Sequence, residues 1–331
     1  MEHIRNFDLQ LFAGDMNTQT TAGLSAEMKT YYGMELLENA KPQLVHNQFA
    51  ATKGLPVGGG KTVEWRKFGS FDKALTPLTE GVTPDGSGIT VSYITKELAQ
   101  YGDYTTVSDM LDLTAIDDVV LEITDRHGAN MGLTLDTVTR NEILQGNQVI
   151  YAPKADGTEI TSRSELDATC KLTGELVAKA ATALKKMNAP KFDGKYICII
   201  HPSVAFDLRQ DEAWLAAHQY AAATELFNGE IGELHGVRFV ETTEAKIFEE
   251  GAGNCAVYAC LFLGKGAYGV VDLSEGTEVI VKPRGSSGTA DPLDQRSSVG
   301  WKGVHAAAIL YDEYIVRVEC GSSYSDQDKA N

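Results

Sequence analysis

The chain has 331 residues, of which 43% are hydrophobic and 23% charged, which is typical of a globular protein with one large domain or two ordinary ones. Its net charge of −17 argues against a protein that grips DNA through the phosphates, because such a protein needs a basic face. The sequence has no run near the ~20 apolar residues of a membrane helix and no Cys-x-x-Cys pair among its five cysteines, so we expect a protein of the reducing cytoplasm with no membrane partner.

Residues 1–54 are expected to form an N-terminal arm followed by a helix. Residues 1–25 are polar, and their one apolar patch consists of Leu9, Leu11 and Phe12. We expect this patch to dock on another surface, because an exposed apolar patch on a free arm is unfavourable. The alternative is a disordered tail.

Residues 55–107 predict a long β-hairpin with a wide tip. The stretch 62–68 alternates between two faces, as a strand does. Residues 76–88 have the composition of a long turn, and strand patterns resume over 89–107. A two-stranded hairpin is marginally stable alone in water, so this one is expected to lie on another surface, its own or a neighbour's.

The strongest helical pattern spans residues 116–146, where apolar side chains recur every three or four positions. Residues 164–275 then alternate between helix and strand patterns, with Ser164 as the expected N-cap of a second helix. Two strands, 302–310 and 314–320, close the chain. We expect them to pair with the long helix and the hairpin base, so that both chain ends build one domain with 164–275 inserted between them.

Two stretches are candidates for catalytic or nucleotide-binding chemistry, and neither has the required pattern. Residues 57–62, VGGGKT, are similar to a phosphate-binding loop, but Leu55 stands where the motif needs its first glycine and a strand pattern follows instead of a helix. His201-Pro-Ser203 ends a strand pattern, and a helix start is the simpler interpretation. The histidines show no metal-binding spacing. We therefore predict no catalytic, cofactor or metal site.

Several stretches, taken in order, carry a resemblance to a known family. They are NFDLQLFA in the arm, LTEGVTPDG at 78–86, YGDYTTVSD at 101–109, the long helix, KYICIIHPSVAFDLR at 195–209, GELHGVRFVET at 232–242 and DPLDQRSSVGWKGVHAAAIL at 291–310. This ordered set covers nearly the whole chain. It resembles the major capsid proteins of tailed bacteriophages with the Hong Kong 97-type fold, in the branch related to the coat protein of phage N-four.

The resemblance implies an α+β fold with five parts. They are the N-terminal arm and helix (1–54), an extended loop (55–107), a peripheral domain (108–163) with the spine helix 116–146, an axial domain (164–275), and return strands that complete the peripheral domain (276–331).

The resemblance also implies a structural subunit that is not an enzyme and needs no cofactor. Such subunits self-assemble as pentamers and hexamers into an icosahedral shell, which encloses double-stranded DNA without sequence-specific binding. We expect the subunit contacts to involve Leu9, Leu11, Phe12, Trp65, Arg66, Lys67, Glu80 and Asp85.

The expected partners are further copies of the chain, a separate scaffolding protein, a portal and, as an optional addition, a decoration protein. We expect assembly in the cytoplasm of the host bacterium and a final location in the virion. Because only 54 residues precede the extended loop, we also expect no large maturation cleavage.

Three other functions stay open from the sequence. One is an encapsulin-like nanocompartment shell, which would package enzymes instead of DNA. Another is a soluble α/β enzyme with its site at His201 or in the Gly58–Gly60 loop. The third is a different phage structural protein, such as a tail or decoration component.

Overall fold

The computed structural model describes most of the chain from residue 44 onward. The described residues are 44–55, 60–69, 86–114, 119–219, 230–272, 276–286 and 291–331, together with positions 36 and 40 and most positions from 71 to 83. The chain divides into two compact units. Among the described residues, the larger unit holds 44–101, 132–276 and 304–331, and the smaller unit holds positions 36 and 40, 102–131 and 277–303.

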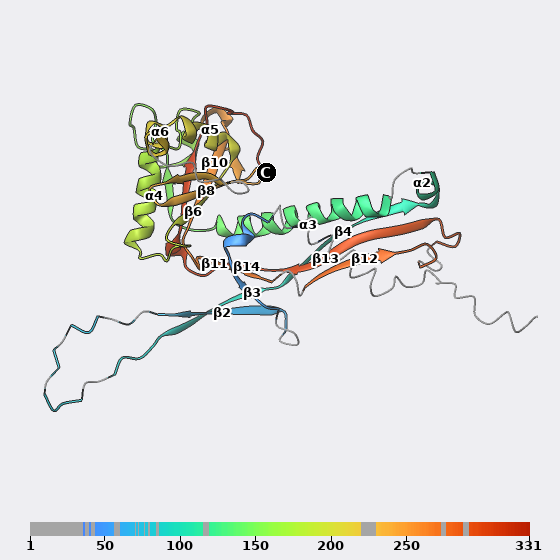
Figure 1. The fold of residues 1–331 in the computed structure, drawn as a ribbon, viewed down its shortest axis with the longest axis horizontal. Coiled ribbons are helices and arrows are strands. Elements are labelled where there is room, and N and C mark those ends of the chain that lie inside the picture. Colours follow the sequence, from blue (N-terminus) through green and yellow to red (C-terminus); the bar gives the residue numbers. More distant parts are fainter. Residues whose placement is uncertain are drawn as a thin grey trace, which may run out of the picture. The chain divides into compact units, whose positions relative to one another are not determined.

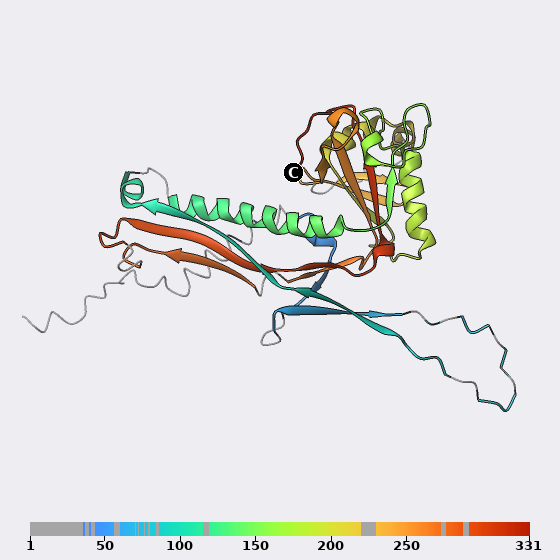
Figure 2. The same ribbon diagram turned by 180° about the vertical axis from the view of Figure 1, so that it is seen from behind.

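The larger unit is built on a seven-stranded mixed sheet, in which six strands follow the order β5-β15-β10-β6-β8-β7 and β9 pairs with β10. The strands are β5 (Val149–Tyr151), β6 (Tyr196–Ile200), β7 (Glu230–Leu234), β8 (Val237–Glu241), β9 (Ile247–Phe248), β10 (Val257–Leu263) and β15 (Ile315–Cys320). Three helices accompany the sheet, α4 (Gly174–Lys186), α5 (Pro202–Gln210) and α6 (Glu212–Gln219). Figures 1 and 2 show α4 running alongside the strands.

Both faces of this sheet are buried, and this explains why its central strands are apolar without alternation. Along β6, Cys198 and Ile200 pack in the core that includes α4 and α5. Ile197 and Ile199 point to the opposite face and pack in a second core. That second core contains Ile143, the last residue of α3 (Val119–Ile143).

A three-stranded sheet and a β-hairpin complete the larger unit. The sheet has the order β1 (Ala51–Lys53), β11 (Tyr268–Val271), β14 (Ala307–Ile309). In the hairpin, β2 (Thr62–Phe68) and β3 (Val91–Glu97) are antiparallel, with Thr62 opposite Glu97 and Phe68 opposite Val91. The predicted hairpin is therefore confirmed for these two strands, and Figure 1 shows the long loop that joins them.

The smaller unit is built on a sheet with the strand order β12 (Thr277–Lys282), β13 (Arg296–His305), β4 (Ala99–Ser108), and α2 (Asp109–Thr114) follows β4. Glycines allow β4 and β13 to approach closely. A Cβ on Gly102 would lie 2.7 Å from the carbonyl oxygen of Trp301, and one on Gly300 would lie 2.6 Å from the Cβ of Tyr104. The indole N–H of Trp301 donates to Asn130 of α3 at 3.1 Å, which ties this sheet to the helix.

The predicted long helix is confirmed as α3, with 25 residues. The predicted start of the next helix is wrong. That helix, α4, begins at Gly174, where the Leu176 backbone N–H donates to Oγ1 of Thr173 at 3.4 Å. Ser164 lies instead in a short 3-10 helix, Arg163–Glu165. Ser164 and Thr173 both carry a hydroxyl group that can cap a helix. The packing of the apolar side chains of the helix determines which of the two residues does so.

The predicted partners of the two closing strands are only partly right. The predicted strand 302–310 is divided between the end of β13, which pairs with β4 next to the hairpin as expected, and β14, which pairs with β11. β15 pairs with β10 and β5 inside the large sheet, not with the long helix or the hairpin base. The physical reason is that β15 is buried on both faces. Val316 and Val318 pack in one core, whereas the other face carries Ile315 in the second core and the buried carboxylate of Glu319. None of the helices in the described ranges combines the length and apolar character that crossing a bilayer requires.

Candidate interaction surface

Apolar side chains stand exposed along the β2-β3 hairpin and the loop that joins its strands. Leu75 is 82% exposed, for example. We define the hairpin surface as Phe68, Phe71, Leu75, Leu78, Val82, Ile89, Val91 and Tyr93, which are all exposed. Exposed apolar side chains gathered on one element mark a surface that binds another molecule.

The inner face of the hairpin base is fixed by apolar packing. Val63 and Trp65 of β2 are buried, and Trp65 is only 7% exposed. Their apolar cluster is completed by Val271, Ala306 and Ala308. The base of the hairpin therefore belongs to the core of the larger unit, whereas its distal part does not.

Two charged side chains add polar contacts at the same base. Lys67 Nζ lies 4.3 Å from the ring centre of Tyr311, a cation–π contact. Lys96 Nζ of β3 lies 2.7 Å from Glu142 Oε1 near the end of α3. Both strands of the hairpin are thus connected to the body of the unit.

The structure separates the contact residues predicted from the sequence. Arg66 has a 67% exposed side chain and lies 3.6 Å from Glu64, and Glu80 is exposed near the tip. Trp65 and Lys67 face their own unit, so we omit them from the proposed interface and assign them to positioning. Four predicted contact residues lie outside the described residues, namely Leu9, Leu11, Phe12 and Asp85.

Sequence reasoning predicted that the hairpin lies on another surface, but it missed the apolar side chains of the hairpin surface. Its signal lies in Leu75, Leu78 and Val82, which stand in a stretch rich in turn residues. Apolar side chains in such a stretch have no helix or strand of their own to pack on.

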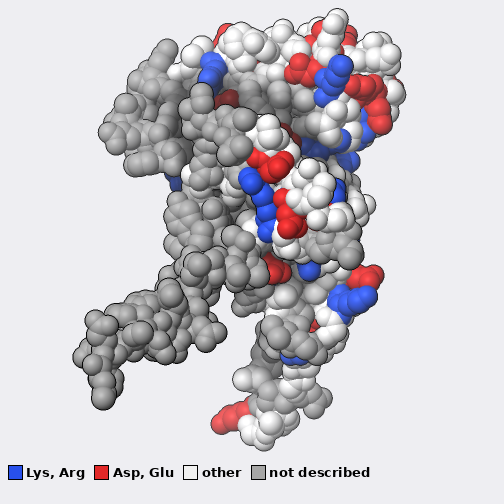
Figure 3. Space-filling model, turned by 90° about the vertical axis from the view of Figure 1, so that its right-hand side faces the viewer, with Lys and Arg blue, Asp and Glu red and all other residues white. Residues whose placement is uncertain are grey.

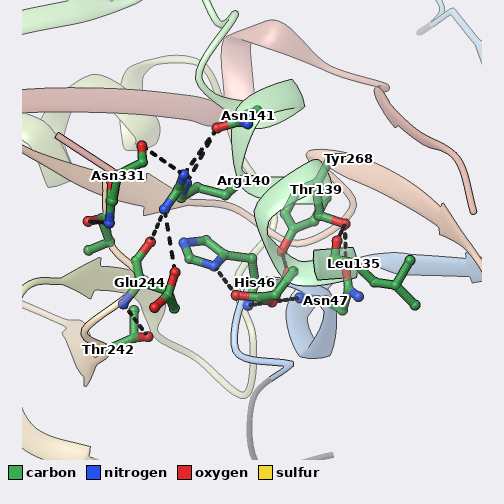
Figure 4. A network of polar contacts seen from close by, with 12 residues as sticks. His46, Asn47, Leu135, Thr139, Arg140, Asn141, Thr242, Glu244, Tyr268 and Asn331 are labelled. Atoms are coloured by element: carbon green, nitrogen blue, oxygen red, sulfur yellow. Dashed lines mark hydrogen bonds and ion pairs between the residues drawn. The ribbon is translucent and has the colours of Figure 1, made fainter. Parts of the chain in front are cut away.

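The last turns of α3 carry a buried polar network, which Figure 4 shows. The carboxylate of Asp136 accepts the His46 backbone N–H at 2.7 Å and lies 2.6 Å from Nδ1 of His46. It also accepts the backbone N–H of Asn47 at 3.3 Å. Because β1 and β2 follow shortly after Asn47, this network fixes the segment that leads into the hairpin.

Arg140 extends the network to two further segments (Figure 4). Its buried guanidinium donates to the backbone carbonyl of Glu244 at 2.6 Å and to that of Asn331 at 3.2 Å. Burial lowers the pKa of Arg140, and the nearby carboxylates of Glu244 and Asp136 oppose that shift. The end of α3 therefore joins chain segments that are far apart in sequence.

His305 at the end of β13 contacts the same helix. Its Nε2 lies 2.9 Å from Oγ1 of Thr139, and the side chain is fully buried. Burial lowers the pKa of His305 to about 4, although the charge of Asp136 acts in the opposite direction. This imidazole is therefore neutral in the folded protein at neutral pH.

A second buried ion pair lies beside β15. Arg163 binds the buried carboxylate of Glu319 with two N–H groups, at 2.7 Å and 2.8 Å. Its guanidinium also lies 3.5 Å from the ring centre of Phe248 and 2.6 Å from the exposed carboxylate of Glu250. The hydrogen bonds to Glu319 raise the pKa of Arg163, so the pair stays charged.

His201, the strongest catalytic candidate of the sequence, is used by the fold. Its Nδ1 accepts the Ser203 backbone N–H at 3.2 Å, which caps α5, and its ring stacks on Tyr258 with 5.0 Å between centres. Burial lowers its pKa. The interpretation of His201-Pro202 as a helix start is confirmed.

Charged groups are mixed on the face of the molecule in Figure 3, where lysine and arginine side chains alternate with acidic ones. Within the described part of the chain, no group of three or more His, Cys, Asp or Glu side chains is placed to hold a metal ion.

A family model described as phage capsid protein matches residues 92–318. Among curated protein sequences there is no significant match.

Solved structures are similar in fold. The capsid of Ralstonia phage GP4 matches with a TM-score of 0.63 and 14% identity, over 86% of this chain and 87% of that one. The cyanophage Pam1 capsid asymmetric unit gives 0.64 and 14%, over 86% and 92%. The virus-like particle from Pyrococcus furiosus gives 0.53 and 12%, over 88% and 99%. The expected α+β fold of Hong Kong 97 type is confirmed, and the phage N-four branch stays a prediction.

Proposed function

The chain belongs to the phage capsid protein family and is a structural major capsid protein, and we propose that it assembles as pentamers and hexamers into an icosahedral shell around double-stranded DNA. In this proposal it acts as a building block and not as an enzyme. The shell is the head of a tailed phage particle.

The observation that carries the proposal is the hairpin surface. Its distal side chains, such as Leu75 and Leu78, are exposed although the hairpin base is packed in the core. A second copy of the chain that covers them would stabilise the contact by about 25 cal/mol for each Å² of apolar surface that it buries. Because the hairpin of one copy meets a different surface on the next, the contact is heterologous, and rotation closes it into rings.

We assign the parts of the fold accordingly. Residues 55–107 are the extended loop, α3 is the spine helix of the peripheral domain, and 164–275 form the axial domain. We also assign β15 and β5 to the axial domain, because β15 pairs with both β10 and β5 in one sheet. The arm at 1–54 and the exposed Arg66 and Glu80 contribute contacts to neighbouring copies.

Negative-stain electron microscopy of the recombinant chain, with light scattering on the same sample, tests the proposal. Closed polyhedral shells, or pentamers and hexamers that close with scaffolding protein, support it. A uniform monomer or dimer under all conditions contradicts it.

A charge reversal tests the loop contact. The Arg66→Glu and Lys67→Glu double variant is expected to lose shells, because it reverses the exposed charge of Arg66 and also removes the Lys67 contact with Tyr311 that positions the strand. A thermal melt of the free subunit controls for folding, and the single Arg66→Glu variant controls for the loss of the Lys67 contact with Tyr311. Normal shells from the double variant would show that this arm does not contact a neighbour.

The content of the shell separates the phage function from an encapsulin-like one. Particles from infected or induced cells are expected to contain nuclease-protected DNA. Packaged protein without DNA would favour a nanocompartment. We further propose that the chain assembles in the host cytoplasm with a separate scaffolding protein, a portal and, as an optional addition, a decoration protein. Co-expression of the chain with each of these proteins tests whether they associate with it.

A further inference from the structure

We propose that Trp65 and Gly269 together set the direction of the hairpin, and that position 269 must lack a side chain for this reason. The inference rests on the proposed function, in which the hairpin meets a second copy of the chain. It assigns a positioning role to two residues that do not themselves form the contact.

The indole of Trp65 lies directly against the backbone of β11. A Cβ on Gly269 would lie 2.6 Å from Nε1 of Trp65 and 3.0 Å from its Cε2. Leu310 closes the same space, with Cδ1 3.2 Å from that position. Any side chain at 269 must therefore displace the indole or the strand.

Backbone conformation does not explain the glycine. Gly269 lies within β11, paired with Ala51 and Ala308, and its φ is outside the left-handed region that favours glycine. Alanine would fit the same backbone. The closest constraint at this position is the space that Trp65 occupies, and the flexible end of Leu310 is a weaker second one.

The Trp65 contact outweighs the two polar anchors of the hairpin base. The Lys96 pair with Glu142 involves a partly exposed lysine, and such pairs contribute little. The cation–π contact of Lys67 is also modest. Trp65 is the largest buried side chain that β2 contributes, so its position decides how β2 leaves the body.

Small shifts at the base become large at the tip. Relief of the overlap needs a movement of about 1 Å, and over a pivot distance of about 7 Å, two strand residues, this is a rotation of about 8°. Along a hairpin arm of about 13 extended residues, roughly 40 Å, the tip then moves about 6 Å. Such a displacement would carry the hairpin surface off its target.

The test measures hairpin direction in unassembled full-length subunits. Spin labels are placed on Lys73→Cys, near the hairpin tip, and Lys186→Cys, at the end of α4. Both lysines are exposed, whereas the native cysteines are all buried, so labelling is selective. Gly269→Ala is expected to shift the distance between the labels by several ångströms. Gly303→Ala, whose Cβ would lie 3.6 Å from its nearest neighbour, is expected to leave it unchanged.

A double-mutant cycle checks the cause. Trp65→Leu removes the atoms that meet Gly269, so it should broaden the distances by itself, and adding Gly269→Ala should then have no further effect. An unchanged distance in folded Gly269→Ala, or an equal shift in both backgrounds, would overturn the proposal. If Gly269→Ala does not fold, the test depends on Trp65→Leu alone. A distance distribution in that variant as narrow as in the wild type would then overturn the proposal. The distance is measured without assembly, so a wild-type chain that forms no shells would sink the proposed function and leave this result standing.

Discussion

Acid should destabilise the larger unit through one buried imidazole, His305. The folded protein binds a proton at His305 with a pKa of about 4, whereas the ordinary value is 6.5. The unfolded chain therefore takes up the proton first as the pH falls, and stability declines between about pH 6.5 and pH 4. Above that window the neutral imidazole is favoured in both states, and the contribution of His305 is complete.

The magnitude follows from the size of the shift. The difference of the two pKa values corresponds to about 3 kcal/mol in total, of which about 2 kcal/mol is lost between pH 7 and pH 5. Burial of the ring beside Thr139 is the cause, so a side chain of similar reach that does not titrate should remove the effect.

Urea unfolding of the free subunit, followed by fluorescence at several pH values, measures this. His305→Gln keeps an amide near Oγ1 of Thr139 and has no proton to gain. We expect its free energy of unfolding to fall less steeply with acidification than that of the wild type, by about 2 kcal/mol at pH 5. Parallel curves for the two proteins would refute the reasoning, because they would place the acid sensitivity in other groups.

Three further predictions concern buried charge and the hairpin. Arg163→Met should cost about 2 kcal/mol of unfolding free energy, because the buried carboxylate of Glu319 loses both hydrogen bonds from Arg163 and keeps only its ion pair with Arg317. Glu250→Gln at the exposed end should cost under about 1 kcal/mol, and similar urea midpoints for the two variants would contradict this. Asp136→Asn should destabilise the segment before the hairpin and speed hydrogen exchange at the backbone amides of His46 and Asn47, which donate to Asp136. Unaltered exchange at these two amides would contradict the proposed role of the network. Leu78→Ser should leave subunit stability within about 0.5 kcal/mol and still reduce the yield of shells under the electron microscope; a wild-type yield would remove Leu78 from the interface.

Local patterns in the sequence predict much of the fold. The alternation of helix and strand predicted over 164–275 is found, and the long helix ends at Ile143, three residues before its predicted end. These elements are long or strongly apolar, and their periodicity is a property of neighbouring residues alone. Pro202 likewise marks its helix start through its own geometry.

Strand partners are a different problem, because they depend on residues far apart in the chain. Ile315, Val316 and Val318 have the same apolar character whichever sheet receives them. The local pattern therefore predicts a strand at this place and leaves its neighbours open.

The candidate site shows the same division. Alternation in β2 predicts that Trp65 shares a face with Val63, and it does not predict which body covers that face. The face of Trp65 is covered by the backbone at Gly269, which lies about two hundred positions later in the chain. The polar network at α3 was beyond prediction for the same reason, since His46 and Asp136 have no sequence spacing that marks a pair.

The position of β15 in the large sheet means that this sheet can be completed only late in synthesis. Among the described strands β5 pairs with β15 alone, and 163 residues lie between Tyr151 and Ile315. At about 5–20 residues per second, a ribosome needs roughly 10–30 s to make that stretch. During this time β5 has no sheet partner and the large sheet is incomplete. A nascent chain therefore lacks one edge of this sheet until β15 has been made.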